Sequence, residues 1–171
     1  MVDGNGVARI DYFPRAQFRA FHERDKRWAI IVAHRRAGKT VACINELIAK
    51  AIALPKPDGR FAYVAPFYTQ AKDAAWTYLK RYAAPVLAES PNESELRVEL
   101  INGSRIRLYG ADNADRLRGI YLDGVVGDEV AQWRPGVWEE VLRPTLMDRQ
   151  GWAAFIGTPA GKNEFWKLWD G

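Results

Sequence analysis

The chain has 171 residues, of which 48% are hydrophobic and 27% are charged, so it can bury one sizeable core and a disordered chain is excluded. The 25 lysines and arginines outnumber the 21 acidic residues and give a formal net charge of +4, which permits a polyanionic partner without requiring one. No stretch approaches the roughly 20 apolar residues of a membrane span. The N-terminal stretch also lacks the apolar core of a signal peptide. We therefore expect a single cytosolic domain over residues 1–171.

The N-terminal segment YFPRAQFRAFHERDKRW precedes the first strand. Its spacing favours Phe18 and Phe21 as core residues of a short helix. Gln17 has two interpretations: its amide reads the edge of an adenine ring, or it is an exposed neighbour on this helix. We assign about residues 1–27 to an adenine-side segment and residues 28–171 to a nucleotide-binding core.

Two predicted elements flank the segment AHRRAGKT at residues 33–40. The run WAIIV, residues 28–32, predicts a buried strand, and the apolar residues that follow recur at helical spacing until Pro55 and Pro57. Cys43 lies in this helix, where we expect a small core residue. Apolar runs and helical periodicity alternate along the whole chain, which predicts an α/β fold with a mostly parallel sheet flanked by helices.

The segment AHRRAGKT has the composition of a phosphate-binding loop between a strand and a helix. Gly38 and its neighbours let backbone N–H groups surround an anion, Lys39 reaches the β- and γ-phosphates, and the Thr40 hydroxyl binds Mg²⁺. Ala33 replaces the usual first glycine, which is compatible with this turn if its φ stays negative. A helix start with a solvated lysine is the alternative. The other expected nucleotide-binding residues are Arg35, Arg36 and Ala37.

The middle of the chain predicts a strand from Phe61, a helix over TQAKDAAWTYLKRYAAPVL, and a β-hairpin near residues 96–109. Asn102-Gly103 is a strong hairpin signal between two alternating segments. Alternation places Leu96, Val98 and Leu100 on one face. The segment ADNADRLRG then predicts a loop.

The segment VVGDEVA predicts an apolar strand that delivers Asp128 and Glu129 at its C-terminal end. Ligands bind at such strand ends in open α/β sheets, so both carboxylates are expected to face the phosphate loop. Asp128 would hold Mg²⁺ and Glu129 would act as general base on the attacking water. An acidic pair that caps the next helix is the alternative.

The last predicted strand, AFIGTP, ends in Gly157, Thr158 and Pro159. Thr158 is placed to sense the γ-phosphate, although a plain strand-to-turn junction fits the residues equally well. A glutamate directly after the aspartate points to the ATPase class with an additional strand between the loop strand and the acidic strand.

Four arginines are candidates for stabilising charge on the transferred phosphoryl group. Arg35 and Arg36 lie inside the loop, and Arg116 and Arg118 lie just before the acidic strand. For each of them a solvated surface position is the alternative. The spacing does not choose among the four.

Taken in order, FPRAQFRAF, IIVAHRRAGKT, FAYVAPFYTQAKDAAW, the Asn-Gly hairpin, LRGIYLDGVVGDEVA and FIGTPAGKNEFW resemble the ATPase domain of the large terminase subunit of tailed double-stranded DNA bacteriophages. The resemblance extends from about residue 12 to residue 169. It implies a P-loop ATPase of the additional-strand, RecA-like class that binds ATP and Mg²⁺ and drives DNA into the procapsid in the host cytoplasm. A C-terminal nuclease domain is expected in the full-length protein, and no nuclease activity is expected from this chain alone.

The resemblance also implies roles for particular residues. Lys39 and Thr40 match the loop lysine and hydroxyl, Asp128 matches the magnesium aspartate, and Glu129 matches the catalytic glutamate. Gln17 falls on the adenine-motif glutamine and residues 157–159 on the coupling motif. Arg118 lies in a segment proposed to supply an arginine finger in trans.

The partners implied by the resemblance are double-stranded DNA, the portal protein, the small terminase subunit and further copies of this chain in a ring. Two other functions fit part of the pattern. The first RecA-like core of a superfamily 2 helicase shares the loop and the acidic strand, and a non-hydrolysing DNA- or portal-docking module would use Lys39 only as a surface charge.

Overall fold

The computed structural model describes residues 8–158, 165, 166 and 168. Its centre is a six-stranded sheet with the strand order β1-β6-β5-β2-β4-β3. The bounds are β1 Trp28–Val32, β2 Arg60–Ala65, β3 Arg97–Glu99, β4 Arg105–Gly110, β5 Gly124–Asp128 and β6 Trp152–Gly157. Every neighbouring pair is parallel except β3 and β4, which confirms the predicted α/β fold with a mostly parallel sheet.

Strand β6 lies between β1 and β5 and pairs with both of them in parallel register. The strand before AHRRAGKT and the strand that ends in Asp128 are therefore separated by one additional strand. This arrangement confirms the class of sheet predicted from the acidic pair.

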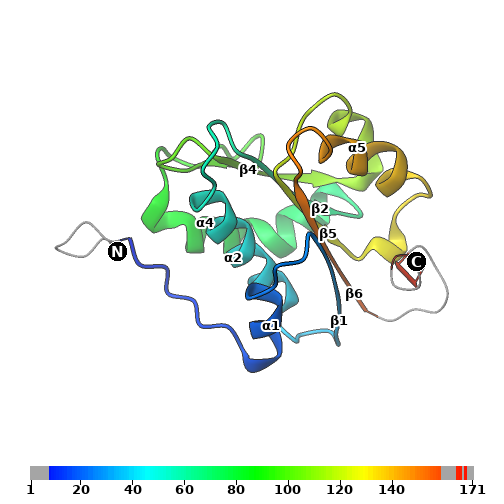
Figure 1. Cartoon of the computed structure of the whole chain (residues 1–171), viewed down its shortest axis with the longest axis horizontal. Coiled ribbons are helices and arrows are strands. Elements are labelled where there is room, and N and C mark those ends of the chain that lie inside the picture. The colour runs from blue at the N-terminus through cyan, green and yellow to red at the C-terminus, as the bar shows by residue number, and fades with distance from the viewer. Residues whose placement is uncertain (1–7, 159–164, 167, 169–171) are drawn as a thin grey trace.

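One face of the sheet is covered by helices from the first half of the chain, which Figure 1 shows around α1, α2 and α4. Their bounds are η1 Ala16–Phe18, α1 Arg19–His22, α2 Lys39–Ile52, α3 Tyr68–Ala71, η2 Lys72–Trp76, α4 Thr77–Ala83 and η3 Ala84–Val86. Helix α2 buries Cys43, Ile44, Leu47 and Ile48 completely, because it is enclosed between the sheet and α4. Cys43 is therefore a core residue, as predicted.

The predicted helix after β2 is present as α3, η2 and α4 in succession, with a π-helical turn over Lys72–Trp76. Ala71, Ala75 and Leu79 are fully buried on its inner side. Tyr78, next to the buried Leu79, is 38% exposed. The π turn adds a residue to one helical turn and so changes which later residues face the sheet.

The other face of the sheet is covered by shorter helices from the second half of the chain, and α5 marks this side in Figure 1. They are η4 Ala111–Leu117, η5 Val130–Gln132, η6 Val137–Leu142 and α5 Arg143–Thr145. The segment ADNADRLRG, predicted as a loop, contains η4, whose Ala111, Ala114 and Leu117 are buried. That prediction was wrong, because packing against the sheet stabilises turns that local propensity does not reveal.

The predicted hairpin is formed by β3 and β4, with Val98 opposite Ile106. Leu96, Val98 and Leu100 are almost fully buried, as alternation predicted. Gly103 has a φ of +81° and no atom within 4 Å of an added Cβ, so backbone conformation and not space favours glycine there.

A buried ionic network fastens the N-terminal segment to α2. Glu46 on α2 is 2% exposed and accepts hydrogen bonds from Arg24, at 2.6 Å, and from His22, at 2.7 Å. His22 in turn hydrogen-bonds to Tyr12 at 3.0 Å. Phe18 and Phe21 are buried beside this network, as predicted, and the segment is thereby held close to the start of α2.

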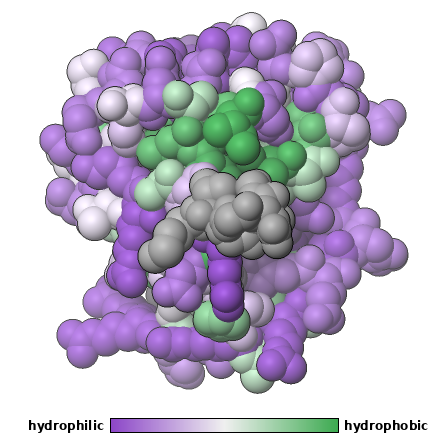
Figure 2. Space-filling model, turned by 90° about the vertical axis from the view of Figure 1, so that its left-hand side faces the viewer, coloured by the Kyte–Doolittle hydropathy of each residue, from purple (hydrophilic) through white to green (hydrophobic). Residues whose placement is uncertain are grey.

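The surface seen from the left of Figure 1 is largely hydrophilic, with one larger hydrophobic patch above the centre of the view (Figure 2). Large apolar side chains remain exposed at scattered positions of the described chain, among them Phe13 and Ile101. Across the described residues, none of the helices has both the length and the apolar content needed to cross a membrane.

Candidate functional site

The candidate site lies where β1, β5 and β6 end. Because these strands are parallel, their C-terminal ends meet at one edge of the sheet. Val32 is in register with Gly157, and Asp128 is in register with Ile156. The backbone N–H of Ala33 donates to the carbonyl of Gly157 at 3.4 Å. The register therefore brings the loop at residues 33–40 together with the acidic pair and the end of β6.

The loop at residues 33–40 has the backbone of an anion-binding turn. Gly38 has a φ of +95° and Arg36 a φ of +64°, whereas Ala33 is not among the residues with positive φ. Ala33 thus meets the condition under which alanine replaces the first glycine. Helix α2 begins at Lys39, so its unpaired N–H groups and the positive end of its dipole point into the loop.

Lys39 is held against its own loop. Its side-chain nitrogen donates to the carbonyls of Ala33, at 2.6 Å, and of His34, at 3.0 Å. The residue is 8% exposed, so the structure contradicts the alternative of a solvated surface lysine. A phosphate placed in this loop would offer the ammonium group a charged acceptor in place of these neutral carbonyls.

The N-terminal segment contacts the loop at the carbonyl of Ala37. Gln17 donates to it at 3.5 Å and Arg15 at 2.9 Å. The Arg15 guanidinium carbon also lies 3.6 Å from the Cβ position of Gly38. Gln17 is exposed, which fits the interpretation of an exposed neighbour on the helix. It also lies beside the phosphate loop, as an adenine contact would require.

A chain of hydroxyl groups joins the loop to the acidic strand. The Tyr63 hydroxyl donates to an Asp128 carboxylate oxygen at 2.5 Å, and Thr40 lies beside the same hydroxyl, where it partly offsets the rise in pKa that burial causes. Tyr63 is fully buried in β2, the strand next to β5. The two residues predicted to hold Mg²⁺ are thus connected through a third that no motif pointed to.

Asp128 is in an environment that opposes its charge. Burial raises the pKa of the Asp128 carboxyl, and the neighbouring charge of Glu129 raises it further, whereas the hydrogen bond from Tyr63 lowers it. A divalent cation beside Asp128 would stabilise the charged form. No cluster of three or more histidine, cysteine or acidic residues occurs in the described part of the chain. Thr40 and Asp128 supply the hard oxygen donors that Mg²⁺ prefers, and a magnesium ion that takes its other ligands from phosphate and water needs only one or two carboxylates.

Glu129 is positioned by its backbone and by Thr158. Its φ of +45° is unusual for a glutamate and marks a sharp turn at the end of β5. The Thr158 hydroxyl donates to one Glu129 carboxylate oxygen at 3.2 Å, and the Thr158 backbone N–H approaches the other at 3.5 Å. The threonine predicted to sense phosphate is therefore in direct contact with the glutamate. Pro159, predicted in the same motif, lies outside the described residues.

The candidate arginines occupy different places. Arg35 and Arg36 are exposed on the loop. Arg118 is about half exposed, forms an ion pair with Asp115 at 2.9 Å, and lines a groove with residues of η6 and α5. Arg116 is also exposed, in η4. The described contacts of Arg118 are thus all outside the phosphate loop of its own chain.

Two residues of the site were missed by the sequence analysis. Tyr63 has a signal in hindsight, since it is the one polar group in the apolar run FAYVA and a buried hydroxyl needs a partner. Arg15 has no such signal. Its position depends on the network around Glu46 that folds the N-terminal segment back onto α2.

Comparisons with known proteins show which proteins this chain is similar to. The terminase large subunit of Thermus virus P23-45 is 29% identical over 178 aligned residues, covering 93% of this chain and 36% of that protein. The terminase large subunit of Escherichia phage T5 is 31% identical over 138 residues, covering 72% of this chain and 31% of that protein. The chain therefore spans about a third of the length of these relatives.

A solved structure shares most of the fold. The ATPase domain of the large terminase of Thermus phage P74-26 superposes with a TM-score of 0.79 at 29% identity, covering 93% of this chain and 70% of that chain. The family described as terminase large subunit, T4likevirus-type, N-terminal, matches residues 30–171. Because this match includes the loop, the acidic strand and the additional strand, the chain belongs to the family of terminase large subunits and corresponds to their N-terminal part.

Proposed function

We propose that this chain is the ATPase motor domain of a phage terminase large subunit, which hydrolyses ATP with Mg²⁺ and moves double-stranded DNA into the procapsid in the cytoplasm of the infected host. The observation that carries the proposal is the meeting of Lys39, Thr40, Asp128 and Glu129 at one edge of the sheet. Family membership and the likeness to an ATPase domain support it. Residues 1–171 form a single domain in this proposal.

The reaction is attack of water on the γ-phosphate. The loop N–H groups and Lys39 bind the phosphates and neutralise the charge that develops on the oxygens. Glu129 accepts a hydrogen bond from the attacking water and takes its proton. Thr158, in contact with Glu129, keeps the carboxylate in place and links its position to β6.

Magnesium would be held by Thr40 and Asp128, and when bound it supplies positive charge to the β- and γ-phosphates. The hydrogen bond from Tyr63 orients the Asp128 carboxylate. Gln17 and Arg15 lie where a nucleoside bound to this loop would extend, so we assign the adenine contact to Gln17.

An arginine from a neighbouring copy completes the site. Arg118 makes its described contacts outside its own phosphate loop, is about half exposed, and is held by Asp115. In a ring around the portal protein it would reach the γ-phosphate of the next copy, while Arg35 or Arg36 would act from within the loop. The small terminase subunit and the portal are the other proposed partners, and a nuclease domain follows in the complete protein.

Titration calorimetry with a non-hydrolysable ATP analogue and Mg²⁺ tests the proposal. The parent chain should bind the analogue, and Lys39→Ala should lose most of the affinity. Lys50→Ala is the matched control, because Lys50 is on the same helix but in its last turn. Equal binding by the parent and Lys39→Ala would contradict the phosphate loop.

The same titration separates the alternatives. A docking module gives no heat signal with the analogue, whereas a motor domain does. The helicase alternative is the weaker one, because the chain belongs to the terminase family. Hydrolysis that rises steeply with protein concentration, and that Arg118→Ala removes, would support the arginine in trans.

A further inference from the structure

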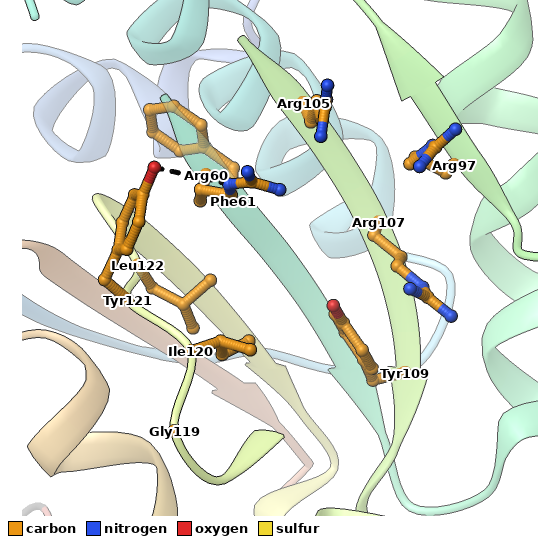
Figure 3. Close-up of a pocket in the computed structure, with 10 residues that line it drawn as sticks. All are labelled: Arg60, Phe61, Arg97, Arg105, Arg107, Tyr109, Gly119, Ile120, Tyr121 and Leu122. Carbon is orange, nitrogen blue, oxygen red and sulfur yellow. Dashed lines mark hydrogen bonds between the residues drawn. The ribbon is translucent and has the colours of Figure 1, made fainter. Parts of the chain in front are cut away.

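A second cluster of charged and aromatic side chains lies on the sheet, on the face that carries η4, η6 and α5. These helices pack on β5 and β6, whereas the residues of β3 and β4 that point to this face are only partly buried. Here the chain forms a groove of about 330 Å³. The side chains that matter are Arg60, Arg97, Arg105, Arg107, Tyr109 and Tyr121, which Figure 3 shows around it.

The alternation of β4 produces this cluster. Ile106 and Leu108 point into the core and are fully buried, so Arg105, Arg107 and Tyr109 must point to the opposite face. Faces of mostly parallel sheets are normally covered and apolar. A row of arginines on an open face is therefore a departure from what the fold alone requires.

The strand register places like charges side by side. Arg97 on β3 is directly opposite Arg107 on β4, and Arg60 on β2 is in register with Arg105 on β4. Like charges opposite each other on neighbouring strands destabilise a sheet. Stability alone would not select this arrangement, and a local conflict of this kind is a sign of a functional surface.

Acidic partners balance only part of the charge. Glu99 pairs with Arg105 at 3.0 Å, and Glu95 pairs with Arg97 at 3.1 Å and with Arg107 at 3.9 Å. Four guanidinium groups thus face two carboxylates. In the described chain Arg60 has no carboxylate partner, and the Nε of Arg107 is buried without a hydrogen-bond partner.

Two tyrosines orient the least balanced arginines. The Arg107 guanidinium lies 5.2 Å from the centre of the Tyr109 ring, and that of Arg60 lies 5.5 Å from the centre of the Tyr121 ring. Arg60 also donates to the Tyr121 hydroxyl at 3.5 Å, the dashed line in Figure 3. Stacking on a ring holds the planar guanidinium while leaving its N–H groups free for a ligand.

We propose that this groove binds phosphate groups of the DNA backbone. The proposal rests on the proposed DNA-moving function and specifies where the DNA is held. Guanidinium groups match phosphate oxygens in a bidentate geometry. Arg105 and Arg107 are two residues apart on one strand, about 6.7 Å, so they present regularly spaced positive charges to a regularly charged polymer. Phosphate contacts carry no sequence information, which suits a protein that moves any DNA.

Fluorescence anisotropy with a labelled duplex, over a series of salt concentrations and without nucleotide, tests the groove. The combined variant Arg60→Gln, Arg107→Gln should bind on the order of 100-fold more weakly, about tenfold for each charged contact. The slope of log affinity against log salt should fall by about 2. The matched control is Lys72→Gln, Arg81→Gln, which removes the same charge from exposed positions of η2 and α4 on the opposite face. It should bind the duplex within about threefold of the parent, because neither residue lines the groove.

Three results would overturn the proposal: no salt-dependent duplex binding by the parent, equal losses in the groove variant and the control, or groove-dependent binding of polyglutamate in place of DNA. Thermal melting of each variant reports folding, and the single Arg60→Gln variant, which breaks no ion pair, carries the test if the combined variant melts early. Because nucleotide is absent, these results do not depend on the Lys39 titration. Failure of the groove and failure of the ATPase assignment are therefore distinguishable.

Discussion

The two halves of the sheet use the same strand geometry in different ways. Around β6 and β5, side chains are buried on both faces of the sheet, the edge strand β1 is only partly buried, and the reactive side chains are found where the strands end. Around β4 and β3 only one face is buried, and charged side chains lie along the strands themselves. Full coverage confines polar chemistry to the strand ends, whereas an open face makes every second residue of a strand available for binding.

This difference separates two tasks. The strand-end site is partly buried and is organised by the hydrogen bonds from Tyr63 to Asp128 and from Thr158 to Glu129. The groove is charged, and its arginines contact aromatic rings and half-buried carboxylates. A precise chemical step needs the first kind of surface, and binding of a repeating polyanion needs the second.

The largest expected effect concerns the strand-end site. Glu129→Gln keeps the size of the side chain and its contact with Thr158 but cannot take a proton from water. ATP hydrolysis should fall by about 10² to 10⁴, the usual contribution of a general base, while binding of the ATP analogue is retained. Steady-state phosphate release measures hydrolysis, and calorimetry measures binding of the analogue. Unchanged hydrolysis would remove Glu129 from the role of base.

The next prediction compares how substitutions on the two faces of β4 change the free energy of unfolding. Leu108→Ala should reduce the free energy of unfolding by about 2–5 kcal/mol, because the side chain is fully buried. Arg107→Gln, one residue away on the open face, should change it by no more than about 0.5 kcal/mol, since it also relieves the charge of Arg97 opposite. Urea unfolding measures both. A comparable loss in the two variants would mean that the arginine is there for stability.

A smaller effect is expected from Tyr63→Phe. This change removes the hydroxyl that donates to Asp128 and leaves the buried ring in place. The lost hydrogen bond is worth about 0.5–1.5 kcal/mol, so the Mg²⁺ concentration needed for half-maximal nucleotide binding should rise several-fold. Binding measured in EDTA should stay the same. An equal loss with and without Mg²⁺ would point to a packing defect instead.

The smallest effect at neutral pH is expected from protonation of Asp128. Burial raises the pKa of Asp128, so its charged form is lost on acidification at a higher pH than for an ordinary aspartate. Mg²⁺-dependent nucleotide binding should weaken as the pH falls through that raised pKa, and Tyr63→Phe should move this loss to still higher pH, because the Tyr63 hydrogen bond lowers the pKa. Asp128→Asn should abolish this pH dependence in the Mg²⁺-dependent part of binding.

Protonation of Asp128 has the opposite effect on the free energy of unfolding, which it does not lower. A carboxyl whose pKa is raised by folding favours the folded state at pH values below its unfolded pKa, and this contribution is lost as the pH rises through the folded value. Acidification should therefore weaken Mg²⁺-dependent binding without any destabilising contribution from Asp128. A fall in melting temperature on acidification that Asp128→Asn removes would contradict this assignment.

Much of the fold and part of the site follow from consecutive residues. The strand WAIIV, the loop AHRRAGKT and the helix after it are local patterns, and so are the Asn-Gly hairpin and the acidic pair at the end of an apolar strand. Even the additional strand between β1 and β5 was predicted, from the glutamate that follows Asp128. Local backbone preferences and hydrophobic alternation act over a few residues, so a single sequence is sufficient to read them.

The tertiary structure alone decided which distant residues meet. Tyr63 reaches Asp128, 65 residues away, only because β2 pairs with β5. Arg15 reaches the loop only because a buried network folds its segment onto α2. Arg97 faces Arg107 only in this register of the hairpin. Such meetings depend on strand order and register, which are set by the packing of the whole core and are not encoded in any short stretch of the sequence.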